Sequence, residues 1–312
     1  MGSQMAETLN WNRNTPWVDS PFFTELLAAA ELDEPSRALV RGFAENGYVI
    51  VDTGLPEATL DAVVRDLEGK YHPGTAAYAD HTRIQDAWSL SAAVKQVATW
   101  PKILETLSLL YRRRPIPFQT LNFRVGSQQR THSDTIHFHC FPARFMCGVW
   151  LALEDVGADN GPLRYYPGSH KLPIFDLHDL GVTASRQKGL YEHYVEYEDF
   201  IEALIAARQL KPVEIDVRRG QALFWAANLL HGGSPIRDPS RTRHTQATHY
   251  YFDGCSYYTP LASDLALGRI EPRAVFDITD GRRVEPVYNG VPLSRLSLRV
   301  RSLLARVDKL LP

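Results

Sequence analysis

The first third of the chain has the spacing of apolar residues that is typical of helices. Residues 22–32 are rich in Ala and Leu, and residues 37–46 carry apolar side chains on one helical face. Pro35 stands where the first turn of a helix accepts proline, and Gly47 stands where a helix commonly ends. We therefore predict helices over residues 22–32, 37–46, 56–67 and 103–110, with a short buried strand over Tyr48–Asp52.

From Pro117 onward the pattern changes to short strands. These segments are rich in aromatic and β-branched residues, and turn signals such as Asn160-Gly161-Pro162 separate them. The predicted strands cover residues 118–125, 145–153, 163–166, 213–217, 222–225 and 245–252. Helices first and several short strands afterwards predict a mainly β protein with flanking helices and a double-sheet jelly-roll core.

Two segments depart from the strand pattern. Residues 177–210 have few β signals and many Tyr, Glu and His, which predicts a long insertion with some helix, of the kind that often covers a site. Residues 295–311 have apolar residues at helical spacing, which favours a C-terminal helix docked on the domain over one lying on a membrane.

The organisation is that of one domain, because the chain has no internal repeat, low-complexity tract or long linker. We expect a single domain over residues 1–312, with a helical N-terminal elaboration at about 20–112 and a jelly-roll core at about 115–255. The insertion would occupy about 175–211, and a C-terminal extension would occupy 256–312.

Composition and charge exclude several classes of binding partner. With 34 basic and 36 acidic residues the formal charge is −2, so no overall positive field attracts nucleic acid or an anionic membrane. No run of about 18 apolar residues occurs, and residues 1–5 lack the apolar core of a signal peptide. Three cysteines without a Cys-x-x-Cys pattern indicate a reduced, cytoplasmic protein. The expected partner is a small molecule, and the oligomeric state stays open.

The first candidate site is Thr131-His132-Ser133-Asp134. In an extended segment, residues two apart point to the same face, so the imidazole of His132 and the carboxylate of Asp134 would converge. Two imidazoles and one carboxylate on one triangular face suit Fe(II) and leave positions for a bidentate co-substrate and O₂. His-x-Asp alone is a weak signal, since many such pairs lie hydrogen-bonded on protein surfaces.

A second segment supplies a further histidine and two arginines, which the first segment lacks. His231 follows a predicted strand that ends at Trp225, and Arg241 and Arg243 precede the next strand. A histidine at a strand end with an arginine on the neighbouring strand fits a third metal ligand and a clamp for a carboxylate. The guanidinium fork matches two carboxylate oxygens at once, as the distal end of 2-oxoglutarate requires.

In this order the motifs resemble the phytanoyl-CoA dioxygenase family. The resemblance runs from about residue 40 to 251, and it rests on His132-Ser-Asp134, Trp150-Leu-Ala-Leu-Glu-Asp155, Asn160-Gly-Pro-Leu163, Pro167-Gly-Ser-His170-Lys171 and His231-Gly-Gly. It implies a double-stranded β-helix core, Fe(II) held by His132, Asp134 and His231, and oxidation of a small molecule by 2-oxoglutarate and O₂ with release of succinate and CO₂. Hydroxylation is the expected outcome, with desaturation, epoxidation or cyclisation as relatives of it.

The resemblance also implies residues around the iron. Arg243 would bind 2-oxoglutarate, with Arg241 as its competitor, and Trp150 and Asn122 match positions near the co-substrate. A small hydroxyl residue is usual two positions after the distal histidine, but Gly233 stands there and Ser234 follows it. Candidate substrate residues are Phe138, His137, His139, Gln119 and Trp225, and Arg124, Arg130 and Arg144 are compatible with a polar or anionic substrate.

Other interpretations explain fewer residues. A cupin-like site using His137 and His139 would need a following Glu, which residues 140–146 do not offer. A halogenase would lack the carboxylate ligand, but Asp134 is present. A jelly roll that merely binds ligand would not need all three ligand positions filled, and a zinc hydrolase would not need the arginine clamp.

Overall fold

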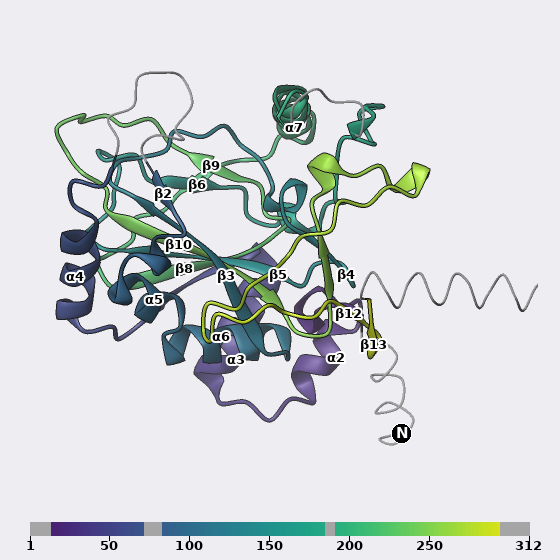
Figure 1. The fold of residues 1–312 in the computed structure, drawn as a ribbon, viewed down its shortest axis with the longest axis horizontal. Helices are drawn as coiled ribbons and strands as arrows, with labels where there is room; N and C mark the ends of the chain where they lie inside the picture. The colour runs from purple at the N-terminus through teal and green to yellow at the C-terminus, as the bar shows by residue number, and fades with distance from the viewer. Residues whose placement is uncertain (1–13, 72–82, 185–190, 294–312) are drawn as a thin grey trace, which may run out of the picture.

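The helices of the first third lie together below the main sheet (Figure 1). The computed structural model describes residues 14–71, 83–184 and 191–293. In α3 (Glu34–Asn46), Asp33 caps the N-terminus by accepting a hydrogen bond from Ser36 N, and Gly47 ends the helix in the left-handed region at φ 82°. The elements are η1 (Trp17–Asp19), α2 (Phe23–Ala28), α3 (Glu34–Asn46), α4 (Glu57–Leu67), α5 (Ala92–Ala98) and α6 (Pro101–Tyr111).

Six antiparallel strands form the main sheet in the order β1-β8-β5-β10-β3-β2. One face packs on the helices, where Gln246 Nε2 and Tyr250 OH donate hydrogen bonds to carbonyl oxygens of α5. The other face carries Trp150, Leu223 and Ala247 and looks toward the interior. The strands are β1 (Tyr48–Asp52), β2 (Arg83–Gln85), β3 (Pro115–Phe123), β5 (Met146–Ala152), β8 (Gln221–Ala226) and β10 (Thr245–Phe252).

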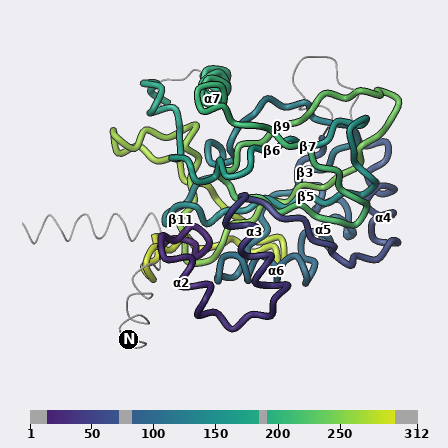
Figure 2. The backbone as a smooth tube through the Cα atoms, turned by 180° about the vertical axis from the view of Figure 1, so that it is seen from behind, coloured from purple at the N-terminus to yellow at the C-terminus, as the bar shows by residue number. Residues whose placement is uncertain are grey.

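A smaller three-stranded sheet lies above this inner face (Figures 1 and 2). It consists of β6 (Leu163–Tyr165), β7 (Val213–Glu214) and β9 (His231–Gly233) in the order β7-β6-β9. Tyr165 of β6 packs in one cluster with Trp150 and Trp225 of the main sheet. The functional segments described below lie between these two sheets.

The insertion contains α7 (Tyr194–Arg208), which covers the outer side of the smaller sheet (Figures 1 and 2). Tyr197 and Ile201 of this helix pack with Ile136, Leu230 and Leu261. Leu261 belongs to the C-terminal extension, so the insertion and the extension close over the same side. The extension adds β11 (Ser256–Tyr258), which pairs with β4 (His139–Phe141), then η7 (Pro260–Ala262), η8 (Leu265–Leu267), β12 (Val287–Tyr288) and β13 (Val291–Pro292).

The predicted elements are confirmed at nearly every position, including the helix within the insertion. The structure adds α5 and the short strands β2, β4, β9 and β11, which are too brief to produce a periodic pattern. The predicted C-terminal helix at residues 295–311 lies outside the described residues. No helix in the described ranges is long and apolar enough to cross a membrane.

Candidate metal centre and active site

The two candidate histidine ligands face each other across an antiparallel bridge. His132 N donates to His231 O at 2.9 Å, and His231 N donates to His132 O at 3.0 Å. Two segments that are far apart in the sequence are thus joined at the two residues whose side chains are the candidate histidine ligands. These main-chain hydrogen bonds fix the spacing of the two backbone segments from which the imidazoles project.

Asp134 completes the group. Ser133 is extended, with φ −112° and ψ 139°, so the side chains of His132 and Asp134 project to the same side before η4 (Asp134–Ile136) begins. Asp134 Oδ1 lies 3.8 Å from Nε2 of His132 and 3.8 Å from Nε2 of His231. One ligand atom from each residue lies within 4.8 Å of the other two, and all three side chains are buried, so the group can hold a metal ion.

Hydrogen bonds orient both imidazoles for coordination. Nδ1 of His132 donates to Arg130 O, and Nδ1 of His231 donates to Leu229 O, each at 2.9 Å. A carbonyl only accepts, so the proton is on Nδ1 and the lone pair is on Nε2, toward Asp134. Burial lowers the pKa of each histidine to about 4, which keeps both neutral near pH 7.

The second carboxylate oxygen of Asp134 has its own partner. Trp225 Nε1 donates to Asp134 Oδ2 at 2.8 Å, from β8 on the inner face of the main sheet. The indole can lie there because Gly148 stands opposite Trp225 on β5. A Cβ at Gly148 would lie 2.0 Å from Trp225 Cζ2. Trp225, a sequence candidate for substrate contact, is placed where it orients a metal ligand.

Arg243 is buried near Tyr165, whose ring stacks on that of His231, and no carboxylate of the described residues lies within ion-pair distance of it. It is 1% exposed, and its Nη1 donates to Gly161 O at 2.7 Å, while Nε is buried with no hydrogen-bond partner. Its guanidinium carbon lies 5.5 Å from the ring of Trp150 and 5.8 Å from that of Phe123. Burial lowers its pKa to about 10, so it remains a cation at neutral pH.

Three hydroxyl groups near Arg243 also lack partners. Tyr165 OH, Thr245 Oγ1 and Ser234 Oγ are buried with no hydrogen-bond partner among the described residues. Thr245 lies two residues after Arg243, at the start of β10, and Tyr165 lies close enough to Arg243 to interact with it electrostatically. Buried polar atoms are rarely left unpaired, so a cation and several hydroxyls in this state fit the carboxylate end of a dicarboxylate co-substrate.

The competing arginine has a different environment. Arg241 has a side chain that is 45% exposed and lies 3.8 Å from Asp159 in a surface ion pair.

The hydroxyl residue that was expected two positions after His231 lies one position farther along the chain. A Cβ at Gly233 would lie 2.7 Å from Gln128 N, so only glycine fits there, and Ser234 is the buried hydroxyl residue.

The structure does not bring Asn122 to the co-substrate side, which corrects the expectation from the sequence. Asn122 pairs with Gln246 of β10, and its Nδ2 donates to Gln246 Oε1 at 3.3 Å on the face that packs against α5. Neighbouring residues of a strand point to opposite faces, and Leu121 and Phe123 take the inner face instead. Trp150 does lie on the inner face, close to Arg243.

Among the candidate substrate residues, Phe138, His137 and Gln119 lie near the ligand group. The ring of His137 is 6.2 Å from that of His132, and Gln119 stands opposite His249 in the sheet. Phe138 packs on His249, with ring centroids 4.7 Å apart. His139 instead packs on Tyr258 and Phe141 in the β4–β11 pair and contacts none of the three ligands, because it projects to the other side of the chain from Phe138.

His249 is a site residue that the sequence did not reveal. Its Nε2 lies 3.8 Å from Asp134 Oδ2, and its Nδ1 is buried without a partner. Desolvation lowers its pKa to about 4, so it is neutral. The signal was present in the alternation along β10, which puts His249 on the same face as Ala247 and opposite Gly148 of β5.

The insertion helix reaches the metal side through its first residue. Tyr194 OH accepts a hydrogen bond from Gln129 Nε2 at 3.4 Å, and the same nitrogen lies 3.4 Å from His132 Nε2. Arg130 forms ion pairs with Glu198, Asp199 and Glu202 of α7. The insertion therefore covers the site, as its composition suggested.

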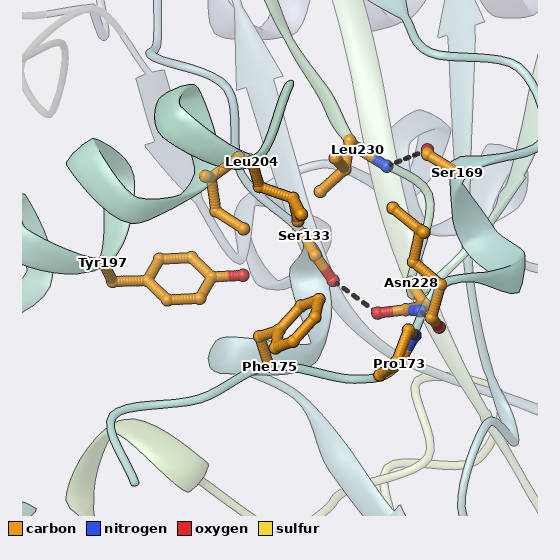
Figure 3. A pocket seen from close by; sticks show the side chains of 10 residues that line it. Ser133, Ser169, Pro173, Phe175, Tyr197, Leu204, Asn228 and Leu230 are labelled. Atoms are coloured by element: carbon orange, nitrogen blue, oxygen red, sulfur yellow. Dashed lines mark hydrogen bonds between the residues drawn. The ribbon is translucent and has the colours of Figure 1, made fainter. Parts of the chain in front are cut away.

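A small pocket lies between α7 and the back of the ligand segment. In Figure 3 the hydroxyl of Tyr197 points into it toward Ser133, whose Oγ lies 3.4 Å from Asn228 Oδ1, and Leu230 N donates to Ser169 Oγ at 2.9 Å. Ser133 lies between two ligands in the sequence, so its side chain points away from the metal side. The pocket is thus a packing feature behind the site.

A family model for phytanoyl-CoA dioxygenase (PhyH) matches residues 43–245, about two thirds of the chain and the part that contains every residue of the ligand group. The chain belongs to the phytanoyl-CoA dioxygenase family. This confirms the family predicted from the sequence, and the His-Asp-His group expected from it is brought together in the structure.

Curated members of the phytanoyl-CoA dioxygenase family match only in part. A phytanoyl-CoA dioxygenase of Arabidopsis thaliana is 27% identical over 164 residues, which cover 50% of this chain and 52% of that protein. The peroxisomal phytanoyl-CoA dioxygenase of Rattus norvegicus is 24% identical, over 51% of this chain and 42% of its own length. The aligned part thus spans about half the length of these relatives.

Solved structures share the fold over more of the chain. The non-heme α-ketoglutarate-dependent epimerase SnoN from nogalamycin biosynthesis superimposes with a TM-score of 0.57 at 19% identity, covering 83% of this chain and 95% of that one. EctD from S. alaskensis with 2-oxoglutarate and 5-hydroxyectoine gives 0.58 at 16% identity, covering 84% and 88%. At these identities the likeness supports the fold.

Proposed function

We propose that the protein is an Fe(II)- and 2-oxoglutarate-dependent dioxygenase that hydroxylates a small molecule and releases succinate and CO₂. The observation that carries the proposal is the His132-Asp134-His231 group together with Arg243, a buried cation that forms no ion pair with any carboxylate in the part of the chain that the structure describes. A metal site alone would also suit a zinc hydrolase. Hydrolysis has no use for a buried clamp that fits a dicarboxylate.

Each residue has a role that follows from its contacts. His132, Asp134 and His231 would hold the iron, which supplies the oxidising chemistry when it is bound with 2-oxoglutarate and O₂. Arg243 binds the distal carboxylate of 2-oxoglutarate, with Tyr165 and Thr245 as hydroxyl partners. Trp225 fixes the direction of the Asp134 carboxylate, and α7 with Tyr194 excludes water from the side where substrate binds.

The proposal extends to the architecture. The main sheet and the β7-β6-β9 sheet enclose the site as the two sheets of a double-stranded β-helix would, with His231 at the start of β9 and His132 bridged to it. Residues 1–312 would form one oxygenase domain, with the insertion and the C-terminal extension as elaborations around the substrate side.

Anaerobic titration of Fe(II) and then 2-oxoglutarate into the metal-free protein tests the proposal. We expect the weak visible charge-transfer band of an iron–2-oxoglutarate chelate, and its loss in Asp134→Ala. Asp280→Ala, on the exposed part of the extension, is the matched control and should keep the band. Absence of the band in the intact protein would contradict the proposal and favour a ligand-binding relative that has lost its iron.

A further inference from the structure

A second arginine faces the site from a part of the chain that the family model does not match. Arg273 lies in the C-terminal extension, beyond residue 245. Its backbone N donates to Tyr257 O at 2.9 Å, and the preceding Pro272 forms a bridge with Tyr258. Tyr257 and Tyr258 belong to β11, which pairs with β4, the strand that directly follows Phe138. This pairing places Arg273 next to Phe138.

The guanidinium of Arg273 lacks an anionic partner. Its central carbon lies 4.7 Å from the centre of the Phe138 ring, and Nη2 donates to His137 O at 3.4 Å. Nε is buried with no hydrogen-bond partner, and no carboxylate within the described ranges lies within ion-pair distance of this side chain. Arg273 is half-buried, so its unpaired guanidinium is open to an anion that approaches from the site.

The side chain is connected to the metal side by direct ring contacts. Phe138 packs on His249 with ring centroids 4.7 Å apart, and His249 Nε2 lies 3.8 Å from Asp134 Oδ2. The positive charge of Arg273 acts on both His137 and His249, each of which lies beside the ligand group. Arg273 therefore belongs to the wall where the substrate would stand.

Arg273 and Arg243 approach the site from different parts of the chain. Arg243 lies two residues before β10 and contacts Trp150 and Phe123, whereas Arg273 lies in the extension and contacts Phe138 beside His249. His249 lies six positions after Arg243, roughly 20 Å along the backbone at about 3.4 Å per residue of extended chain. We therefore assign the co-substrate to Arg243 and consider Arg273 for the substrate.

Two of the three arginines that the sequence offered for an anionic substrate are occupied, and the third, Arg124, is exposed. Arg130 is paired with three acidic residues of α7, and Arg144 donates to His170 O and Leu172 O. Around Arg273, by contrast, Gln119 and His249 add polar groups on the sheet side, and Tyr194 adds an aromatic wall through its contact with His137. This is a cation beside hydrogen-bonding groups in an aromatic enclosure.

We infer that Arg273 binds a carboxylate of the substrate, so that the enzyme oxidises small carboxylic acids held between Phe138, Gln119 and His249. A guanidinium matches a carboxylate through two parallel hydrogen bonds, and its Nε edge is the part left unpaired here. The inference rests on the proposed function and names the substrate class of that site.

The test uses matched pairs of small carboxylic acids and their primary amides, with phosphate monoesters as a third set. Binding to the metal-free protein is measured by ligand-observed NMR, and stimulation of succinate release is measured with the iron-loaded enzyme. Arg273→Gln removes the charge, Arg273→Lys keeps it, and Arg282→Gln changes an exposed arginine of the same extension. Thermal unfolding and the iron–2-oxoglutarate band of each variant report folding and co-substrate binding separately.

We expect acids to bind and stimulate turnover while their amides do not. Arg273→Gln should weaken acid binding by about 10- to 100-fold, Arg273→Lys by less, and Arg282→Gln not at all. The inference is overturned if amides act as well as acids, if only phosphate monoesters act, if no acid acts, or if Arg273→Gln binds acids normally. In each of those cases an intact iron–2-oxoglutarate band leaves the proposed function standing.

Discussion

Trp225 holds the carboxylate of Asp134 in the orientation that metal binding needs. Its Nε1 donates to Oδ2 at 2.8 Å, which leaves Oδ1 at 3.8 Å from the Nε2 atoms of both histidines. The metal-facing oxygen is thus selected by a residue that is not itself a ligand. Such partners of metal ligands commonly affect affinity as strongly as the geometry of the ligands.

Trp225→Phe should weaken metal binding while the protein stays folded. The substitution keeps an aromatic ring but removes the Nε1 donor, so the carboxylate loses its fixed rotamer. We expect a loss in Fe(II) or Mn(II) affinity of about 10-fold or more, measured by titration of the metal-free protein. Trp100→Phe, which removes an indole hydrogen bond to Thr53 O far from the site, is the control. Equal affinities in the two variants would contradict the role assigned to Trp225.

Gly148→Ala should displace the same indole from the opposite strand. The added methyl group would overlap the ring of Trp225, which is enclosed between the sheets and has nowhere to move. We expect a destabilisation of about 1–3 kcal/mol together with weaker metal binding, measured by urea unfolding and metal titration. Gly42→Ala in α3 meets only an ordinary contact with Val49 at 3.7 Å and should show neither effect. Normal metal affinity in Gly148→Ala would argue against the packing described here.

Arg243→Gln should raise the concentration of 2-oxoglutarate that is required for turnover. Removal of a charge-assisted double hydrogen bond in a buried site weakens binding by about 10- to 100-fold. Arg241→Gln is the matched control, because that side chain lies at the surface near Asp159. The measurement is the dependence of the charge-transfer band and of succinate release on 2-oxoglutarate concentration. A larger effect in Arg241→Gln than in Arg243→Gln would reverse the assignment.

Acid should destabilise the protein partly through His170. This residue is buried with Nε2 3.2 Å from Ala44 O, and desolvation is the main cause that lowers its pKa from 6.5 to about 4. Between those values the unfolded chain binds a proton that the folded chain does not. The stability contribution is therefore complete above pH 6.5 and is lost as pH falls toward 4, by about 1.4 kcal/mol per pH unit.

His170→Gln isolates that contribution, because an amide can still donate to Ala44 O and cannot titrate. Urea unfolding of the metal-free protein at several pH values should give a shallower slope for the variant between pH 6.5 and 4, by about one proton. Above pH 7 the slopes of the two proteins should coincide. An unchanged slope at acidic pH would show that His170 titrates normally in the folded state.

The sequence predicted the elements and the ligand set because both depend on local patterns. Alternation along an extended segment was sufficient to pair His132 with Asp134, and strand ends located His231. His249 was missed because the alternation along β10 gives only the face on which it lies. Its significance comes from the approach of its Nε2 to 3.8 Å from Asp134 Oδ2, which depends on how β10 packs against a segment far away in the sequence.

The face of a strand on which a side chain lies, and the burial of that side chain, were harder to predict than the position of the strand in the sequence. Asn122 was expected near the co-substrate, yet the register of β3 against β10 turns it toward α5, and a shift of one residue reverses a face. Arg241 and Arg243 could not be separated in the sequence, since spacing alone does not show which of them enters the interior. Arg273 lies outside the family pattern, and only the β11–β4 pairing brings it to Phe138.

The main-chain bridge between His132 and His231 bears on whether the protein can lose and regain its metal ion without unfolding. The two segments are clasped by peptide groups, whether or not an ion sits between the rings. We therefore expect the bridge to persist after a chelator removes the ion, so that reloading requires entry of an ion and no refolding. An enzyme built in this way would keep its scaffold through repeated loss and replacement of its iron.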